Sequence, residues 1–128
     1  MSNFKFEKFN VYQDSVDLYQ EINLLIVDLL LDKRFNFVNQ LERCCMSIPL
    51  NIAEGATVRS SKDFTRFMTI AMGSLNELVA CIDLLKAMKF ISTEKANELK
   101  AKAQNIAEQL GALIKNARKI QPKRHYHK

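Results

Sequence analysis

Two long stretches of the chain carry apolar residues at alternating spacings of three and four. The first consists of Phe64, Phe67, Ala71, Leu75, Leu78, Ile82 and Leu85, and the second of Ala96, Leu99, Ala103, Ile106, Leu110, Leu113, Ala117 and Ile120. This period places each set on one face of an α-helix. The two stretches therefore predict two long amphipathic helices.

The first half of the chain predicts two more helices. The first runs from about Val11 to Leu31, and its apolar arc is wider than one face of a bundle needs. The second runs from about Val38 to Thr57. Its apolar stripe consists of Leu41, Cys44, Cys45, Ile48 and Ile52. Four amphipathic helices joined by short loops predict an all-α, antiparallel up-down four-helix bundle.

Serine residues mark the expected starts of the third and fourth helices. Ser60 or Ser61 can accept hydrogen bonds from the free amides of the third helix, and Ser92 can do the same for the fourth. Asp63 follows in the first turn of the third helix, where the helix dipole favours an anion. Pro122 is expected to end the fourth helix.

Length and composition favour one helical domain. The chain has 128 residues, 48% of them hydrophobic, with only 3 Gly and 2 Pro, a balance that disfavours disorder and turn-rich β folds. We expect a single domain over residues 1–128, with a basic C-terminal tail from about residue 121. No stretch has the roughly 18 uninterrupted apolar residues of a membrane span, and the charged start lacks an apolar signal region. A cytoplasmic protein without a membrane partner is therefore expected.

Positive charge is concentrated toward the C-terminus. The net charge is +5, with seven Lys/Arg against nine Asp/Glu in residues 1–64 and twelve against five in residues 65–128. The candidate nucleic-acid-binding residues are Lys115, Arg118, Lys119, Lys123 and Arg124. A basic run of this kind can attract phosphates, although a solubilising end is the commoner explanation of any one such run.

Helix two also carries a polar stripe. Its members are Arg43, Ser47, Asn51 and Glu54, at spacings of four, four and three. If helices two and three pack antiparallel, Arg43 comes level with Glu77. The same packing brings Glu54 level with Arg66. We expect two partly buried structural ion pairs that fix the register; the alternative is four surface charges that contribute under about 1 kcal/mol per pair.

Pro49 lies inside helix two, where it removes one backbone hydrogen bond. Either a helix begins at Pro49, or a continuous helix bends there and Ser47 or Asn51 bonds the loosened backbone. The unbroken apolar stripe favours the bend. Gly55 either lets another backbone approach or begins the fraying of the helix end, whereas Gly73 predicts close packing in the middle of helix three.

The sequence holds no recognisable catalytic motif. There is no P-loop, GxGxxG or HExxH, and the only histidines, His125 and His127, lie at the C-terminus. The three cysteines, including the adjacent Cys44 and Cys45, make a poor disulfide framework and predict buried small hydrophobic side chains. We expect no enzyme activity, no metal and no cofactor.

The segments "QLERCCMSIPLNIAEG" and "RSSKDFTRFMTIAMGSLNEL" resemble the small four-helix-bundle family of proteins encoded in intervening sequences of bacterial 23S ribosomal RNA genes. A related member is the accessory variability determinant of diversity-generating retroelements. The matching residues are Gln40, Leu41, Arg43, Ser47, Ile48, Pro49, Asn51, Ile52, Ala53, Glu54, Gly55, Arg59, Phe64, Arg66, Phe67, Ala71, Gly73, Ser74, Leu75, Glu77 and Leu78. Together with "FEKFNVYQ" near the start, the resemblance covers nearly the whole chain. Cys44 departs from the alanine that the family usually has.

The resemblance implies a bundle that assembles into a ring-like homopentamer, which would give the wide apolar arc of helix one a partner surface. For the retroelement relative it implies binding of nucleic acid and of a reverse transcriptase. The expected function is therefore a non-enzymatic oligomer that binds RNA or DNA backbones. The alternative is a homo-oligomeric scaffold or adaptor that docks a partner protein such as a reverse transcriptase.

Overall fold

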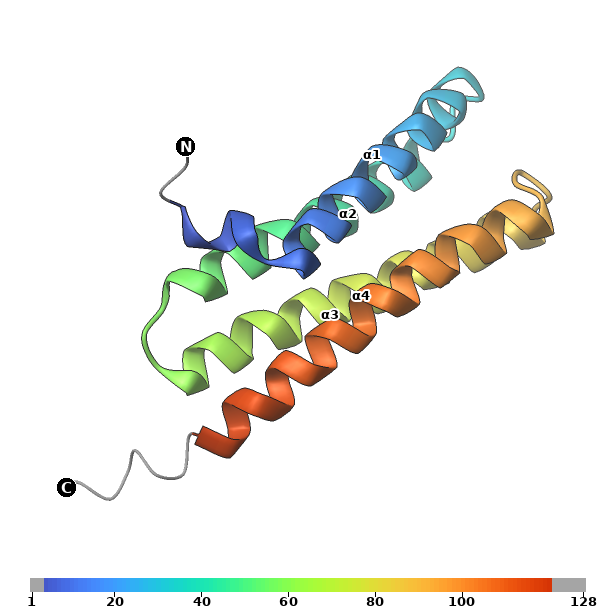
Figure 1. Cartoon of the computed structure of the whole chain (residues 1–128). Helices are drawn as coiled ribbons and strands as arrows, with labels where there is room; N and C mark the ends of the chain where they lie inside the picture. Colours follow the sequence, from blue (N-terminus) through green and yellow to red (C-terminus); the bar gives the residue numbers. More distant parts are fainter. Residues whose placement is uncertain (1–3, 121–128) are drawn as a thin grey trace.

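The computed structural model describes residues 4–120. Its elements are a short 3-10 helix, η1 (Lys5–Lys8), and the α-helices α1 (Asn10–Leu31), α2 (Phe35–Thr57), α3 (Ser61–Ala87) and α4 (Thr93–Ile120). Successive helices run in opposite directions, each packs on the next, and α1 also contacts α4 (Figure 1). The predicted all-α antiparallel bundle is confirmed, although α2 begins before the expected Val38.

The starts of α3 and α4 have the expected serine caps. Ser60 Oγ accepts a hydrogen bond from the amide of Asp63 at 3.0 Å. Ser92 Oγ accepts one from the amide of Lys95, also at 3.0 Å. Each cap satisfies a backbone donor that the first turn of a helix leaves free. The expected helix end at Pro122 lies outside the described residues.

The predicted apolar stripes meet in the core of the bundle. The stripe residues of α2 are all buried, and so are those of α3 from Ala71 to Leu85. Phe64 and Phe67, in the first two turns of α3, are half-buried and pack against this core. Val27, an apolar residue of α1, is 52% exposed. The wide arc of α1 is therefore only partly covered within one chain.

Helix α3 is long and apolar enough to cross a membrane, judged by length and composition alone. Its most apolar stretch has a mean hydropathy of 1.4, and 39% of that stretch is buried inside the bundle. A core helix passes the same test, and Met68, Leu78 and Ile82 of α3 are fully buried. The buried apolar residues of α3 thus belong to the core of the bundle, while Ile70, Leu84 and Met88 are exposed.

Helix α2 is continuous through Pro49, so no helix begins at this residue. Pro49 has no amide hydrogen and leaves the carbonyl of Cys45 without its usual helical partner. Nearby, Asn51 Nδ2 donates to the carbonyl of Ser47 at 2.7 Å and to Ser47 Oγ at 3.0 Å. Ser74 Oγ of α3 donates to the same Ser47 Oγ at 2.7 Å. The polar residues beside Pro49 therefore link α2 to α3.

The two glycines singled out in the sequence have different surroundings. Gly55 is buried, and a Cβ atom there would lie 2.5 Å from Met68 Cε and 3.0 Å from Phe67 Cβ. The missing side chain therefore lets the end of α2 approach the start of α3. Gly73 is exposed, and a Cβ atom there would meet nothing within 4 Å. The prediction of close packing at Gly73 is wrong for this chain.

Candidate nucleic-acid interface

Three of the candidate nucleic-acid-binding residues lie in the described part of the chain. Lys115, Arg118 and Lys119 are exposed on the last turns of α4. Arg118 and Lys119 follow Lys115 by three and four residues, so both lie beside it on the helix surface. Lys123 and Arg124 lie outside the described residues.

The lysines in the first half of α4 are paired with carboxylates. Lys95 Nζ lies 3.5 Å from Glu21 Oε1, and Lys100 Nζ lies 2.8 Å from Asp83 Oδ1. Lys102 also pairs with Glu21. By contrast, the basic residues of the last turns form no ion pair with any residue between 4 and 120. No carboxylate of the described residues therefore neutralises their charge.

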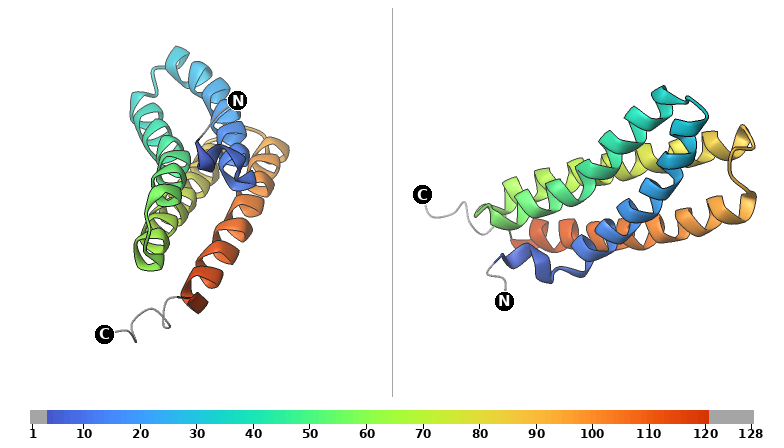
Figure 2. Two further views of the ribbon diagram at one scale, coloured as in Figure 1. Left: turned by 60° about the vertical axis from the view of Figure 1, so that its left-hand side comes forward. Right: turned by 90° about the horizontal axis from the view of Figure 1, so that it is seen from above.

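More basic side chains lie at the same end of the bundle. The up-down path brings η1, the α2–α3 connection and the last turns of α4 together, as Figure 2 shows. We define the basic end as Lys5, Lys8, Arg59, Lys62, Lys115, Arg118 and Lys119. All are exposed, and none has an ion-pair partner among the described residues. The carboxylates of Glu7, Glu54 and Asp63 also lie at this end.

The sequence alone predicted no binding role for Lys5, Arg59 or Lys62, because these cations lie far along the chain from the basic C-terminal run. The signal that could have found them is the topology itself. In an up-down bundle the chain start, the second connection and the chain end lie together. Scattered cations at these three places therefore add to one surface.

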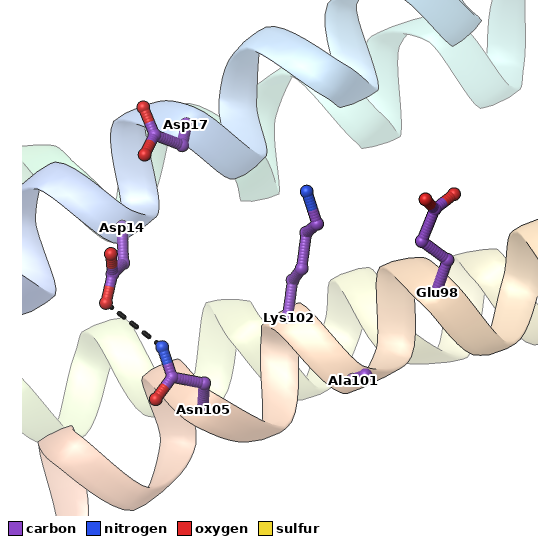
Figure 3. Close-up of a pocket in the computed structure, with 6 residues that line it drawn as sticks. All are labelled: Asp14, Asp17, Glu98, Ala101, Lys102 and Asn105. Atoms are coloured by element: carbon purple, nitrogen blue, oxygen red, sulfur yellow. Dashed lines mark hydrogen bonds between the residues drawn. The ribbon is translucent and has the colours of Figure 1, made fainter.

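A hollow of about 460 Å³ lies between α1 and α4. Figure 3 shows Asp14 and Asp17 on α1, with Asp14 pointing toward Asn105 on α4, and Glu98 and Lys102 of α4 pointing toward α1. Asp14 Oδ2 accepts hydrogen bonds from Asn105 Nδ2 at 3.0 Å and from Gln109 Nε2 at 2.7 Å. These polar groups are engaged in joining the two helices.

Glu21, on α1, extends this polar contact. Hydrogen bonding to Lys102 lowers the pKa of Glu21, and the same contact raises the pKa of Lys102. Each partner stabilises the charged form of the other, as in a structural ion pair. Within residues 4–120, no group of three or more His, Cys, Asp or Glu side chains could hold a metal ion.

The structure forms one of the two ion pairs expected between α2 and α3. Arg43 Nη2 lies 3.3 Å from Glu77 Oε2, but the Arg43 side chain is 69% exposed, so the expected burial is wrong for Arg43. The second pair is not formed, since no ion pair joins the described residues Glu54 and Arg66. Arg66 instead lies over the ring of Phe67, 4.4 Å from its centroid. A cation-π contact of this kind stabilises the guanidinium without a carboxylate.

The three cysteines are buried and form no disulfide with one another. Burial raises the pKa of the Cys44 thiol to about 12. Burial also raises the pKa of Cys45 and of Cys81. A thiol that stays protonated is a poor nucleophile. The prediction of buried small hydrophobic side chains is confirmed.

Comparison with known proteins identifies the family. The family model described as 23S rRNA-intervening sequence protein matches residues 7–112. The chain belongs to this family. This 23S rRNA-intervening sequence protein is also similar to a crystal structure of a protein of unknown function from the S23 ribosomal protein family of Bacteroides thetaiotaomicron. The two chains are 26% identical, with 82% of this chain and 98% of the other covered and a TM-score of 0.78. No curated protein matches.

The family match does not extend over the whole basic end. Arg59 and Lys62 lie within the matched residues 7–112 of this 23S rRNA-intervening sequence protein, whereas Lys5 and the cations after Ala112 lie outside them. The family match therefore does not account for this grouping of cations, which is observed in the structure of this chain.

Proposed function

We propose that this 23S rRNA-intervening sequence protein is a non-enzymatic, homo-oligomeric protein of the cytoplasm that binds the phosphate backbone of RNA or DNA. The observation that supports it is that Lys115, Arg118 and Lys119 have no carboxylate partner among residues 4–120, whereas the earlier lysines of α4 are paired. Free cations displace the counterions of a phosphate backbone, and this release favours binding. Burial raises the pKa of the Cys44 thiol, which makes it a poor nucleophile and supports a role without thiol catalysis.

Self-association would multiply this charge. The family resemblance implies a homopentamer, and five copies of a chain with net charge +5 carry about +25. Exposed apolar side chains on α1 support association, since Leu24 is 72%, Val27 52% and Leu31 80% exposed. Contact between copies would remove this surface from water. Light scattering should give the mass of a pentamer, and a monomer at all concentrations would contradict it.

Binding to structured RNA and to duplex DNA over a salt series tests the proposed activity. The wild type should bind both, with an affinity that falls as salt rises. The triple variant K115Q/R118Q/K119Q removes three phosphate contacts, so the slope of log affinity against log salt on duplex DNA should be shallower by about 2 to 3. Neutralising Lys123 and Arg124 as well should weaken binding further.

A matched control removes the same charge from the opposite end of the bundle. Lys33, Lys86 and Lys89 lie in or beside the α1–α2 and α3–α4 connections, and none forms an ion pair with a described residue. Lys33 and Lys89 have positive φ angles of 59° and 61°, which asparagine tolerates well. The control K33N/K86Q/K89N should bind like the wild type. Equal loss in both triple variants, or no binding by the wild type at low salt, contradicts the proposal.

The second candidate function is a scaffold or adaptor that docks a partner protein such as a reverse transcriptase. Exposed apolar side chains on α3 favour it, because Ile70 is 42%, Leu84 54% and Met88 41% exposed. A reverse transcriptase gene beside this one, with co-purification that survives nuclease treatment, would support this role. Loss of the partner on nuclease treatment would contradict the scaffold role and favour nucleic-acid binding.

A further inference from the structure

A recess of about 340 Å³ opens at the basic end. Residues of η1, the α2–α3 connection, the start of α3 and the last turns of α4 line it. These parts of the chain lie toward the left of Figure 1. Lys5 lines it from η1, Arg59 and Ser61 from the connection and the start of α3, and Asn116 from α4. No carboxylate of the described residues is among those that line it.

The lining suits an anion, unlike the hollow of Figure 3, which carboxylates line. Lys5 and Arg59 are exposed and form no ion pair with a described residue. Ser61 and Asn116 add a hydroxyl and an amide that can donate hydrogen bonds. A phosphate oxygen in this recess would meet two cations and neutral donors, and no carboxylate is among the described residues that line it.

Another part of the recess wall is apolar and aromatic. Phe9, Val58, Phe64 and Leu113 contribute to it, and all four are half-buried. Base stacking on aromatic rings tolerates any sequence, because every base has a π-face. A duplex keeps its bases stacked and paired, whereas single strands and loops can place a base on a protein ring. Phe9, Phe64 and Leu113 also pack against the core of the bundle. Among forms of nucleic acid, only an unpaired nucleotide could place its base on this wall.

We propose that this recess holds one unpaired nucleotide of a single-stranded or looped nucleic acid. Its phosphate lies at Lys5 and Arg59, and its base lies against Phe9 or Phe64. This inference rests on the proposed function, because the other cations of the basic end attract the strand. It adds a preference for unpaired over duplex nucleic acid, which a purely electrostatic surface does not require.

Fluorescence anisotropy with labelled single-stranded and duplex oligonucleotides of equal length, as RNA and as DNA, tests the inference. The wild type should prefer the single strands. The double variant K5Q/R59Q should make the salt slope on single strands shallower by about 1 to 1.5. The control K33N/K86Q removes equal charge from the opposite end and should bind like the wild type. Melting curves for every variant verify that it folds.

Two aromatic variants separate stacking from charge. Phe64→Leu should weaken single-strand binding about fivefold or more and leave the salt slope unchanged, because leucine stays apolar but has no ring. Phe9→Leu provides the same test at the junction of η1 and α1, in case the first variant disturbs the packing of α3. Neither variant should change duplex binding.

The outcomes distinguish this inference from the proposed function. The recess is ruled out if K5Q/R59Q and both aromatic variants keep the wild-type affinity for single strands while K115Q/R118Q/K119Q loses it. In that case backbone binding by α4 still stands. A wild type that prefers duplexes, or a free mononucleotide that competes as well as a strand, also overturns the recess proposal. No binding by the wild type at low salt removes both proposals.

Discussion

Arg43 on α2 and Glu77 on α3 form an ion pair, with Arg43 Nη2 3.3 Å from Glu77 Oε2. The same guanidinium nitrogen donates to Gln40 Oε1 at 2.8 Å. The pair joins two adjacent helices at the position that an antiparallel register predicts. Because water surrounds the Arg43 side chain, the pair contributes under about 1 kcal/mol to folding. The register of α2 against α3 is therefore held mainly by buried apolar contacts.

A double-mutant cycle should find coupling only in the pair that the structure forms. Glu77→Lys should destabilise the protein slightly, and Arg43→Glu in the same chain should recover part of the loss, with a coupling of about 0.2 to 1 kcal/mol. A second cycle that reverses the charges of Glu54 and Arg66, singly and together, should show no coupling, because Arg66 contacts Phe67 instead. Urea unfolding measures both cycles. Equal coupling in the two pairs would contradict the observed contacts.

Alanine should have opposite effects at two glycines. Gly55→Ala places a Cβ atom 3.0 Å from Phe67 Cβ, which cannot move without α3, so we expect a loss of about 1 to 2 kcal/mol. Gly73→Ala meets open space and improves helix propensity, so we expect a gain of about 0.5 to 1 kcal/mol. Thermal unfolding compares the two variants. A loss at Gly73 would indicate that another copy of the chain packs there.

The hydroxyl link between α2 and α3 should behave as a unit. Ser47→Ala leaves Asn51 Nδ2 and Ser74 Oγ without the hydroxyl that both contact, and we expect a loss of about 1 to 2 kcal/mol. Ser74→Ala should cost about 1 kcal/mol or less, because Asn51 still donates to Ser47. The double variant should cost less than the sum of the two losses. Additive losses in urea unfolding would show that the contact carries little energy.

Acid should remove the contribution of the Glu21–Lys102 pair. The pKa of Glu21 is lowered from 4.5, so the pair stabilises the folded state above that pH. Its contribution is lost as the pH falls through the lower pKa of the folded state. Lys102→Met should therefore reduce stability at about pH 7 and have little effect at about pH 2.5. An equal loss at both pH values would show that Lys102 acts by packing.

The cysteines should react only after unfolding. Burial holds the pKa of Cys44 at about 12, so its thiol stays protonated under ordinary conditions. Mass spectrometry after brief alkylation at about pH 8 should find unmodified native protein and three modified cysteines in denaturant. Rapid labelling of the native protein at Cys44 would contradict the buried environment.

The parts of the fold that depend on neighbours along the chain were predictable. The apolar period gave α3 and α4, because alternating spacings of three and four define one helix face. Ser60 and Ser92 were recognisable as caps, because capping involves residues three positions apart. The basic last turns of α4 were also predictable, because Lys115, Arg118 and Lys119 lie close together in the sequence.

The contacts between distant segments were less predictable. The sequence could place Arg66 level with Glu54, but not show that a ring on the next residue of its own helix would take the guanidinium. It could mark Gly55 and Gly73 as unusual, but not show which of them faces a neighbouring helix. Rotations of a few tens of degrees about a helix axis decide such contacts, and the apolar period does not fix rotation that closely.

The sequence by itself determined four amphipathic helices, their order and the basic C-terminal turns of α4, because these properties follow from local spacing and composition. Only the tertiary structure decided that Lys5 and Arg59 share a recess with Asn116. Packing of the helices in three dimensions brings these segments together, although long stretches of chain separate them. The physical reason is that burial of the apolar faces sets the path of the backbone, and that path then gathers isolated cations at one end of the bundle.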